Sequence, residues 1–181
     1  MLPVALALED RDVLVIGMGR VGAHKARQML DAGARVHVIS DAVVSDVPEG
    51  VASVRIRPYQ HGDLDGYFLV VSATADPAVN DLIVAEAKER HVLLNVVDDP
   101  PRCSFYFTSV HRDGDVIVSV SSSGASPSLA QWVRRRVQEL LPSGLAGVAH
   151  TLREERAALH AAGESTERDW SQRVEELTRD L

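Results

Sequence analysis

Short apolar runs alternate with helix-forming segments over the first hundred residues of the chain. Runs rich in Val, Ile and Leu predict strands at 13–17, 35–40, 53–58, 67–73 and 92–98. The apolar character is nearly continuous within each run. Such runs are typical of strands that are buried on both faces of a sheet.

Helical segments lie between several of these strands. Segment 20–33 is rich in helix formers and ends at Gly33, a residue suited to the position just after a helix. Segment 76–91 begins with Asp76 as a cap and Pro77 in the first turn. Its apolar residues recur at helical spacing: Val79, Leu82, Ile83 and Ala87. Strands that alternate with helices predict a doubly wound parallel sheet of the α/β class.

The pattern changes after the sequence DDPP, residues 98–101. Two apolar runs, 104–110 and 115–121, flank the sequence HRDG. With Asp113 and Gly114 at the turn, these runs predict an antiparallel hairpin.

A helix follows the hairpin, with Ser126 as its cap and Pro127 at its first position. One apolar stripe runs along it, formed by Leu129, Val133, Val137 and Leu140. The remainder, 143–181, reads as charged helix broken near 161–166. Its apolar stripe is thin, so we expect it to need a partner surface.

Composition and charge narrow the class of protein. The 181 residues carry 19 Lys+Arg against 26 Asp+Glu, a net charge of -7 that opposes non-specific nucleic-acid binding. No apolar run approaches membrane-spanning length, and the first residues lack the basic start of a signal peptide. The single cysteine, Cys103, allows no internal disulfide and fits a reducing compartment, so we expect a cytoplasmic protein.

Three glycines with GxGxxG spacing directly follow the first predicted strand. Gly17 permits a tight turn, Gly19 lets the backbone approach a pyrophosphate, and Gly22 allows close packing of helix against strand. Asp41 ends the second predicted strand, where an acid accepts hydrogen bonds from a ribose and disfavours a 2′-phosphate. This favours NAD over NADP. The alternative is a structural turn in which Asp41 only caps.

Asp98 follows the fifth predicted strand, at the edge where open α/β sheets usually bind ligands. Its carboxylate could act as a general base. The alternative is an ordinary turn in DDPP.

A loop of small residues, 119–128, leads into the helix capped by Ser126. Its N–H groups and hydroxyls could receive a carboxylate or phosphate, or the loop could only cap the helix. Arg102 and the cluster 134–136 could form a basic patch, or the cluster could be a solvated helix face. The seven histidines lack metal-ligand spacing, so we predict no resident metal site.

Four stretches occur in order: 2–40, which contains VLVIGMGRVG; VVSATADPAVN at 70–80; NVVDDPPRCSFYFTSV at 95–110; and VSVSSSGASPSLAQWVRRRVQELLP at 118–142. Together they resemble the siroheme synthase family, namely its precorrin-2 dehydrogenase and sirohydrochlorin ferrochelatase module. The resemblance runs from Leu2 to about Pro142 and continues more loosely to the region of Trp170.

The resemblance implies a Rossmann-like doubly wound parallel sheet, followed by a smaller α+β dimerisation domain and a helical C-terminal tail. We place these domains at 1–99, 100–142 and 143–181. It also implies a homodimer that binds a tetrapyrrole substrate. In the reaction so implied, NAD⁺ takes a hydride from precorrin-2, a proton is lost and sirohydrochlorin forms. Many relatives then insert Fe²⁺, as a substrate, to give siroheme.

Site residues follow from the motifs and the resemblance together. Asp98, the aspartate of NVVD, is implied in proton removal and chelation. The predicted cofactor contacts are Gly17, Gly19, Arg20, Val21, Gly22, Asp41, Ala42 and Thr74. The predicted substrate contacts are Ser122, Ser123, Gly124, Ser126, Arg102 and Arg135.

Ser123 departs from the family pattern, because it stands where the family's loop usually has a glycine. Its Cβ could narrow the loop or forbid a positive φ. Two alternatives to a bifunctional enzyme stay open. One is a dehydrogenase without chelatase activity, and the other is a non-catalytic sensor or delivery protein for NAD or a tetrapyrrole.

Overall fold

The computed structural model describes residues 1–43 and 45–181. These residues form two compact units, Met1–Tyr106 and Phe107–Leu181, and each is described by itself. No helix among the described residues is long and apolar enough to cross a membrane.

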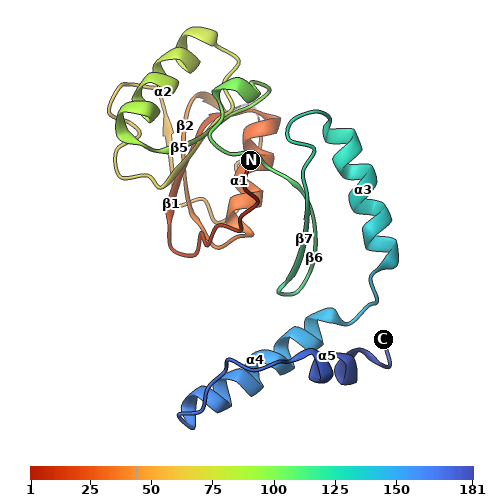
Figure 1. Cartoon of the computed structure of the whole chain (residues 1–181). Helices are drawn as coiled ribbons and strands as arrows, with labels where there is room; N and C mark the ends of the chain where they lie inside the picture. The colour runs from red at the N-terminus through yellow and green to blue at the C-terminus, as the bar shows by residue number, and fades with distance from the viewer. Residues whose placement is uncertain (44) are drawn as a thin grey trace. The chain divides into compact units, whose positions relative to one another are not determined.

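The first unit is built on a parallel sheet with the strand order β3-β2-β1-β4-β5 (Figure 1). The strands are β1 (Asp12–Met18), β2 (Arg35–Val43), β3 (Ser53–Ile56), β4 (Leu69–Ser72) and β5 (Leu93–Val96). The order reverses between β1 and β4, and ligands of doubly wound sheets bind at the carboxyl ends of strands beside such a reversal. The predicted doubly wound parallel sheet is confirmed.

Both faces of this sheet are covered. Leu14 and Ile16 of β1 belong to a core cluster that includes Ile83 and Ala87 of α2 (Pro77–Arg90). The intervening Val15 is also fully buried and points to the other face, because side chains alternate along a strand. Figure 1 shows α1 (Arg20–Leu30) and α2 on opposite sides of the sheet.

The prediction that Leu82 belongs to the buried face of α2 is wrong. Leu82 is 58% exposed, whereas Glu86 is completely buried. The reason is that segment 57–68, which joins β3 to β4 without a helix, supplies hydrogen-bond donors to the Glu86 carboxylate from Gly62 and Leu64. A buried carboxylate is tolerated when such partners surround it.

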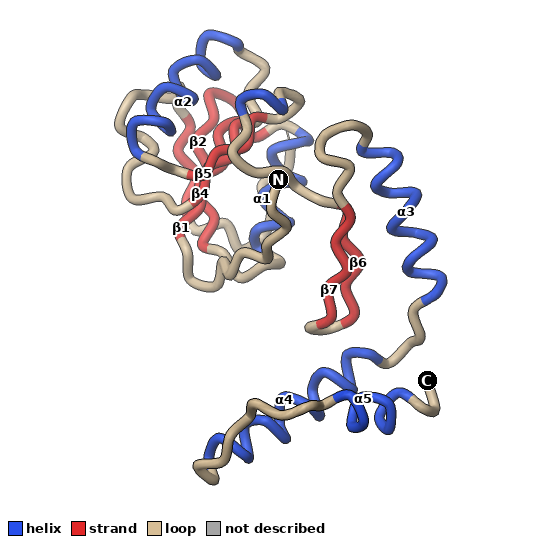
Figure 2. The backbone as a smooth tube through the Cα atoms, in the orientation of Figure 1, coloured by secondary structure: helices blue, strands red, loops and turns tan. Residues whose placement is uncertain are grey.

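The second unit begins with a hairpin of β6 (Ser109–Asp113) and β7 (Val116–Val120), drawn in red in Figure 2. The antiparallel pairing is as predicted, but the turn residues are Gly114 and Asp115, one position later than expected. The sequence predicts a strand that begins at residue 104, but residues 104–108 do not form a strand.

The start of that predicted strand belongs to the first unit instead. Ser104 exchanges backbone and side-chain hydrogen bonds with Leu94 of β5, and the carbonyl of Phe105 accepts a bond from Asn95. The division between the compact units therefore falls after Tyr106, seven residues beyond the domain boundary expected at residue 99.

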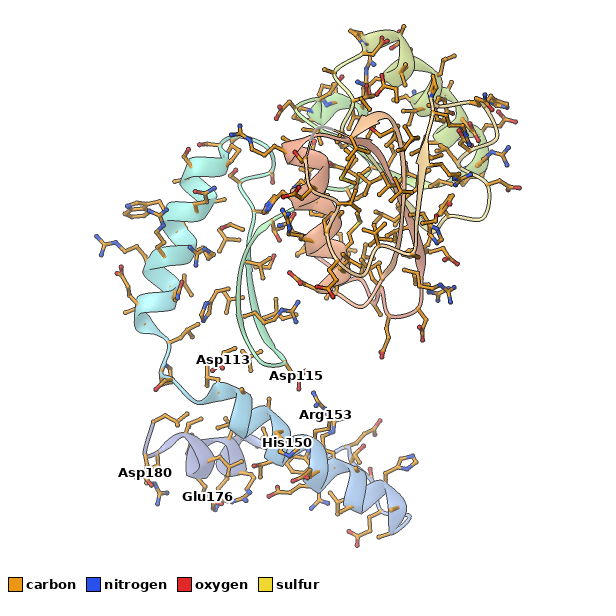
Figure 3. All side chains as sticks on the ribbon, turned by 180° about the vertical axis from the view of Figure 1, so that it is seen from behind. Asp113, Asp115, His150, Arg153, Glu176 and Asp180 are labelled. Carbon is orange, nitrogen blue, oxygen red and sulfur yellow. The ribbon has the colours of Figure 1, made fainter. Side chains whose placement is uncertain are left out.

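Helices α3 (Pro127–Leu140), α4 (Leu145–Ala161) and α5 (Ser171–Thr178) complete the second unit. Ser126 caps α3 as predicted, with its hydroxyl accepting a bond from the N–H of Leu129 at 3.2 Å. In Figure 3, Asp115 at the hairpin tip lies beside Arg153 of α4, and the two side chains form an ion pair. The Asp113 carboxylate also accepts a hydrogen bond from the N–H of Ala146. Asp113 and Asp115 of the hairpin therefore both bind α4.

Candidate functional site

The glycine loop joins β1 to α1 at the reversal of strand order. A Cβ at Gly22 would lie 2.0 Å from the carbonyl oxygen of Gly17, so only glycine allows α1 to approach β1 this closely. Gly17 has φ +95, and a Cβ there would lie 2.8 Å from the carbonyl oxygen of Ala73. These contacts explain two of the three glycines by packing alone.

Gly19 differs from the other two glycines of the motif. A Cβ built on it would meet no atom within 4 Å, so the space above this residue is open. Gly19 also precedes the first turn of α1, where no side chain caps the helix. By contrast, α2 is capped by Asp76 and α3 by Ser126. The first N–H groups of α1 are thus left to bind an anion, as a dinucleotide pyrophosphate requires.

The other predicted cofactor residues surround this loop. Asp41 is exposed at the carboxyl end of β2, and its Oδ1 accepts a bond from the N–H of Ala42 at 2.9 Å. The preceding Ser40 accepts a bond from the N–H of Met18, which fastens the end of β2 to the glycine loop. A ribose hydroxyl donor could therefore reach Asp41 from a dinucleotide bound to the loop.

Three further residues border the same loop. Thr74 follows β4, and its N–H lies 3.0 Å from the position of a Cβ at Gly17. Arg20 and Val21 are exposed in the first turn of α1. All the predicted cofactor residues therefore belong to one edge of the sheet, and the glycine loop fits an NAD(P) pyrophosphate.

Asp98 lies on a tight turn that follows β5. The N–H of Asp99 donates to the carbonyl of Val96 at 3.2 Å, which closes the turn. Asp98 adopts φ +60, a left-handed conformation that is uncommon for a residue with a side chain. Its side chain is exposed, so the carboxylate is open to a substrate.

Lys25 of α1 is a neighbour of Asp98 that sequence reasoning missed. Burial lowers the pKa of the Lys25 ammonium group, and the negative charge of Asp98 opposes that shift. The sequence does carry a signal, because Lys25 is three residues after Gly22 and four before Met29, both buried residues of α1. A lysine at this spacing on a helix faces the sheet rather than bulk water.

Arg102, a predicted substrate contact, already binds two carboxylates within the first unit. Its guanidinium lies 2.7 Å from the Asp81 carboxylate and 3.1 Å from that of Asp99. A substrate carboxylate would have to compete with these partners. Arg102 stays a prediction as a substrate contact.

The serine loop of the second unit is a turn with two left-handed residues. Ser123 has φ +53 and Gly124 has φ +85. The side chain of Ser123 therefore does not forbid the positive φ that a glycine adopts easily. The Ser122 hydroxyl accepts a bond from the N–H of Ser126 at 3.0 Å and donates to its carbonyl at 2.9 Å. In this structure it closes the loop on itself, and Ser126 caps α3.

The arginine cluster of α3 is mostly engaged with its own helix. Arg134 donates to the Gln138 side chain, and Arg136 pairs with Glu139 at 3.1 Å. Arg135 is exposed. Among residues 1–43 and 45–181, no group of three or more His, Cys, Asp or Glu side chains could hold a metal ion.

Comparison with known proteins agrees with this geometry. Residues 4–109 match a family model described as NAD(P)-binding. The chain belongs to this NAD(P)-binding family. The match supports the predicted NAD cofactor at the level of NAD(P) binding.

Proteins named siroheme synthase are among the relatives of this NAD(P)-binding chain. The protein of Photorhabdus laumondii is 39% identical over 153 residues, which cover 82% of this chain and 32% of that protein. That of Azotobacter vinelandii is 38% identical over 159 residues, covering 84% of this chain and 34% of that protein. The chain thus spans about a third of the length of these relatives. The resemblance inferred from the motifs is confirmed.

A solved structure described as SirC, precorrin-2 dehydrogenase, matches with a TM-score of 0.74 at 24% identity. The match covers 99% of this chain and 88% of that one. It shows that the two chains share a fold, including the hairpin and the helices that follow the sheet.

Proposed function

We propose that the chain is an NAD-dependent dehydrogenase that converts precorrin-2 to sirohydrochlorin in siroheme biosynthesis. The observation that carries the proposal is the exposed carboxylate of Asp98 at the sheet edge that also presents the glycine loop. The identity of about 39% to proteins named siroheme synthase supports the substrate class.

In this proposal each group has a defined task. The glycine loop and the uncapped start of α1 hold the pyrophosphate, and Asp41 accepts hydrogen bonds from the ribose. NAD⁺ supplies the hydride acceptor when it is bound. Asp98 takes the proton that is lost as the hydride leaves, so the macrocycle loses two electrons in all. Asp41 also disfavours a 2′-phosphate, which supports NAD⁺ over NADP⁺.

The substrate bears several carboxylates, whereas the chain is acidic overall. Binding therefore requires a local concentration of positive charge and of free N–H groups. The candidates are Arg102, Arg135 and the loop formed by Ser122, Ser123, Gly124 and Ser126. A homodimer is part of the proposal, because the outer side of α3 exposes Leu129, Trp132 and Leu140. A cytoplasmic location stays a prediction.

Insertion of Fe²⁺ into sirohydrochlorin is a second candidate activity. It is favoured by the solvent-exposed position of Asp98, which could accept pyrrole protons as the metal enters. This step needs no permanent metal cage. The names of the relatives, siroheme synthase, support it as well.

Replacement of Asp98 tests the main proposal. We expect Asp98→Ala to lower the turnover of precorrin-2 by about 100-fold or more, because one positioned base contributes roughly 10²–10⁴ to such a rate. The measurement is NADH absorbance together with the sirohydrochlorin spectrum, with NAD⁺ and NADP⁺ compared for the unaltered chain. Adding Fe²⁺ to the same mixture, with the spontaneous rate subtracted, reports chelation.

The control is NAD⁺ affinity, which should be nearly unchanged in Asp98→Ala. Wild-type turnover by this variant contradicts the role of Asp98. Absence of turnover by the unaltered chain, when it is folded and binds NAD⁺, contradicts the dehydrogenase itself and favours the sensor or delivery protein.

A further inference from the structure

Cys103 lies beneath the turn that carries Asp98. Its Sγ accepts a hydrogen bond from the N–H of Val96 at 3.2 Å. The same sulfur lies 3.2 Å from the carbonyl oxygen of Val96 and 3.3 Å from that of Asp99, and its S–H can donate to either. One thiol thus contacts both ends of the four-residue turn, Val96 to Asp99.

We propose that Cys103 is a positioning residue, whose thiol holds this turn in the shape that directs the Asp98 carboxylate toward the substrate. The inference rests on the proposed role of Asp98 in the dehydrogenation.

The turn needs support because Asp98 has φ +60. A residue with a side chain adopts this conformation only when its surroundings fix it, and such residues cluster at functional sites. The backbone bond from Asp99 to Val96 closes the turn from within. Cys103 adds contacts from outside, on the side where β5 has no neighbouring strand.

β5 is an edge strand, and its outward N–H and C=O groups belong to alternate residues. Ser104 satisfies the first pair, because its Oγ accepts from the N–H of Leu94 at 2.7 Å and its N–H donates to the Leu94 carbonyl at 2.8 Å. Cys103 satisfies the next pair, on Val96. Two consecutive residues therefore cover the edge of β5, and only the thiol also reaches the turn.

Cys103 is itself held firmly in place. Its N–H donates to the carbonyl of Pro100 at 3.1 Å, which closes the short 3-10 helix η1 (Pro100–Arg102). Arg102 fixes η1 to α2 through its ion pair with Asp81. The thiol is half-buried, and burial raises its pKa, so the S–H is retained as a donor at neutral pH.

The test compares Cys103→Ala and Cys103→Val with Cys103→Ser, in the full chain with NAD⁺ and precorrin-2. Alanine removes the thiol, and valine replaces its volume without its hydrogen bonds. We expect kcat to fall about 10- to 100-fold in both, because a misplacement of about 1 Å can cost that much, with KM for precorrin-2 and NAD⁺ affinity nearly unchanged. Serine keeps a donor and an acceptor, and should restore most of kcat.

Ser104→Ala is the matched control. It removes a side chain that bonds to the same strand but not to the turn, so we expect lower thermal stability and wild-type kcat. Wild-type kcat in both Cys103→Ala and Cys103→Val overturns the proposal, as does a serine variant no faster than the folded alanine and valine variants. If the alanine variant does not fold, valine against serine decides the question.

Asp98→Ala, measured alongside, distinguishes a failure of the Cys103 role from a failure of the Asp98 role. If it loses turnover while the cysteine variants keep theirs, Asp98 remains the base and the positioning role of Cys103 fails. If Asp98→Ala keeps wild-type turnover, the proposed function of Asp98 fails, and the role of Cys103 fails with it.

Discussion

Two residues with side chains, Asp98 and Ser123, adopt left-handed conformations at places where the sequence suggests chemistry. Asp98 could be assigned to the carboxyl edge of the sheet from the sequence, because it directly follows an apolar strand. The φ of +60 at Asp98 could not be predicted from the sequence. The groups that support it come from Cys103 and Asp99, and nothing in the local pattern identifies such partners. Lys25 was missed for a related reason, since only its packing relates it to Asp98.

The left-handed conformation of Ser123 should affect the stability of the chain. Ser123→Gly should change the free energy of unfolding by between zero and about +1.5 kcal/mol. Relief of the left-handed strain contributes roughly 1–2 kcal/mol, and the greater flexibility of unfolded glycine offsets about 0.5–1 kcal/mol of it. Ser123→Val should lower stability by about 1–3 kcal/mol, because a β-branched residue resists φ +53. Urea unfolding measures both, and a valine variant as stable as the unaltered chain contradicts the prediction.

At the scale of elements, strands and helices could be predicted because each pattern is local. Asp76 and Ser126 cap their helices, as their positions before a proline and an apolar repeat indicated. The buried face of α2 was harder to predict. Glu86 is buried because Gly62 and Leu64 from a distant segment bind its carboxylate, and sequence periodicity does not report such long-range partners.

Glu86→Gln should destabilise the first unit. Burial raises the pKa of Glu86, but hydrogen bonds from Tyr59, from the N–H groups of Gly62 and Leu64, and from Arg90 outweigh it, so the pKa lies below its ordinary value. This stabilisation is present above the unfolded pKa of about 4.3 and is lost as the pH falls through the folded pKa.

We therefore expect Glu86→Gln to lower the free energy of unfolding by about 1.5–3 kcal/mol near pH 7, the range for hydrogen bonds to a charged group. The difference from the unaltered chain should shrink toward about pH 3. Urea unfolding at both pH values checks this, with exposed Glu89→Gln as a control on the same helix. An equal loss of unfolding free energy at both pH values would show that the charge of Glu86 is not the cause.

At the scale of the whole molecule, the predicted apolar stripe of α3 divides in two. Val133 and Val137 are half-buried, while Leu129 is 52% and Leu140 83% exposed. Trp132 is also exposed, with Arg136 stacked over its ring at 5.6 Å. Leu129, Trp132 and Leu140 lie on one side of the helix, and an exposed apolar patch of this kind is typical of an interaction site.

We expect a dimer in sedimentation velocity at micromolar concentration. The double variant Leu129→Asp, Leu140→Asp should sediment as a monomer, because two charges would have to be buried without partners. Gln131→Asp adds a charge on the opposite side of α3 and should stay dimeric. A monomeric unaltered chain contradicts the proposal, as does a double variant that remains a dimer.

The close packing of the glycine loop affects the entropy change of cofactor binding. Because no side chain larger than hydrogen fits between Gly22 and the carbonyl of Gly17, the loop has little freedom once α1 is docked on β1. The entropy of ordering it is lost when the chain folds, so little remains to be lost when a dinucleotide arrives. The cofactor-binding surface is therefore preorganised by folding, before the cofactor binds.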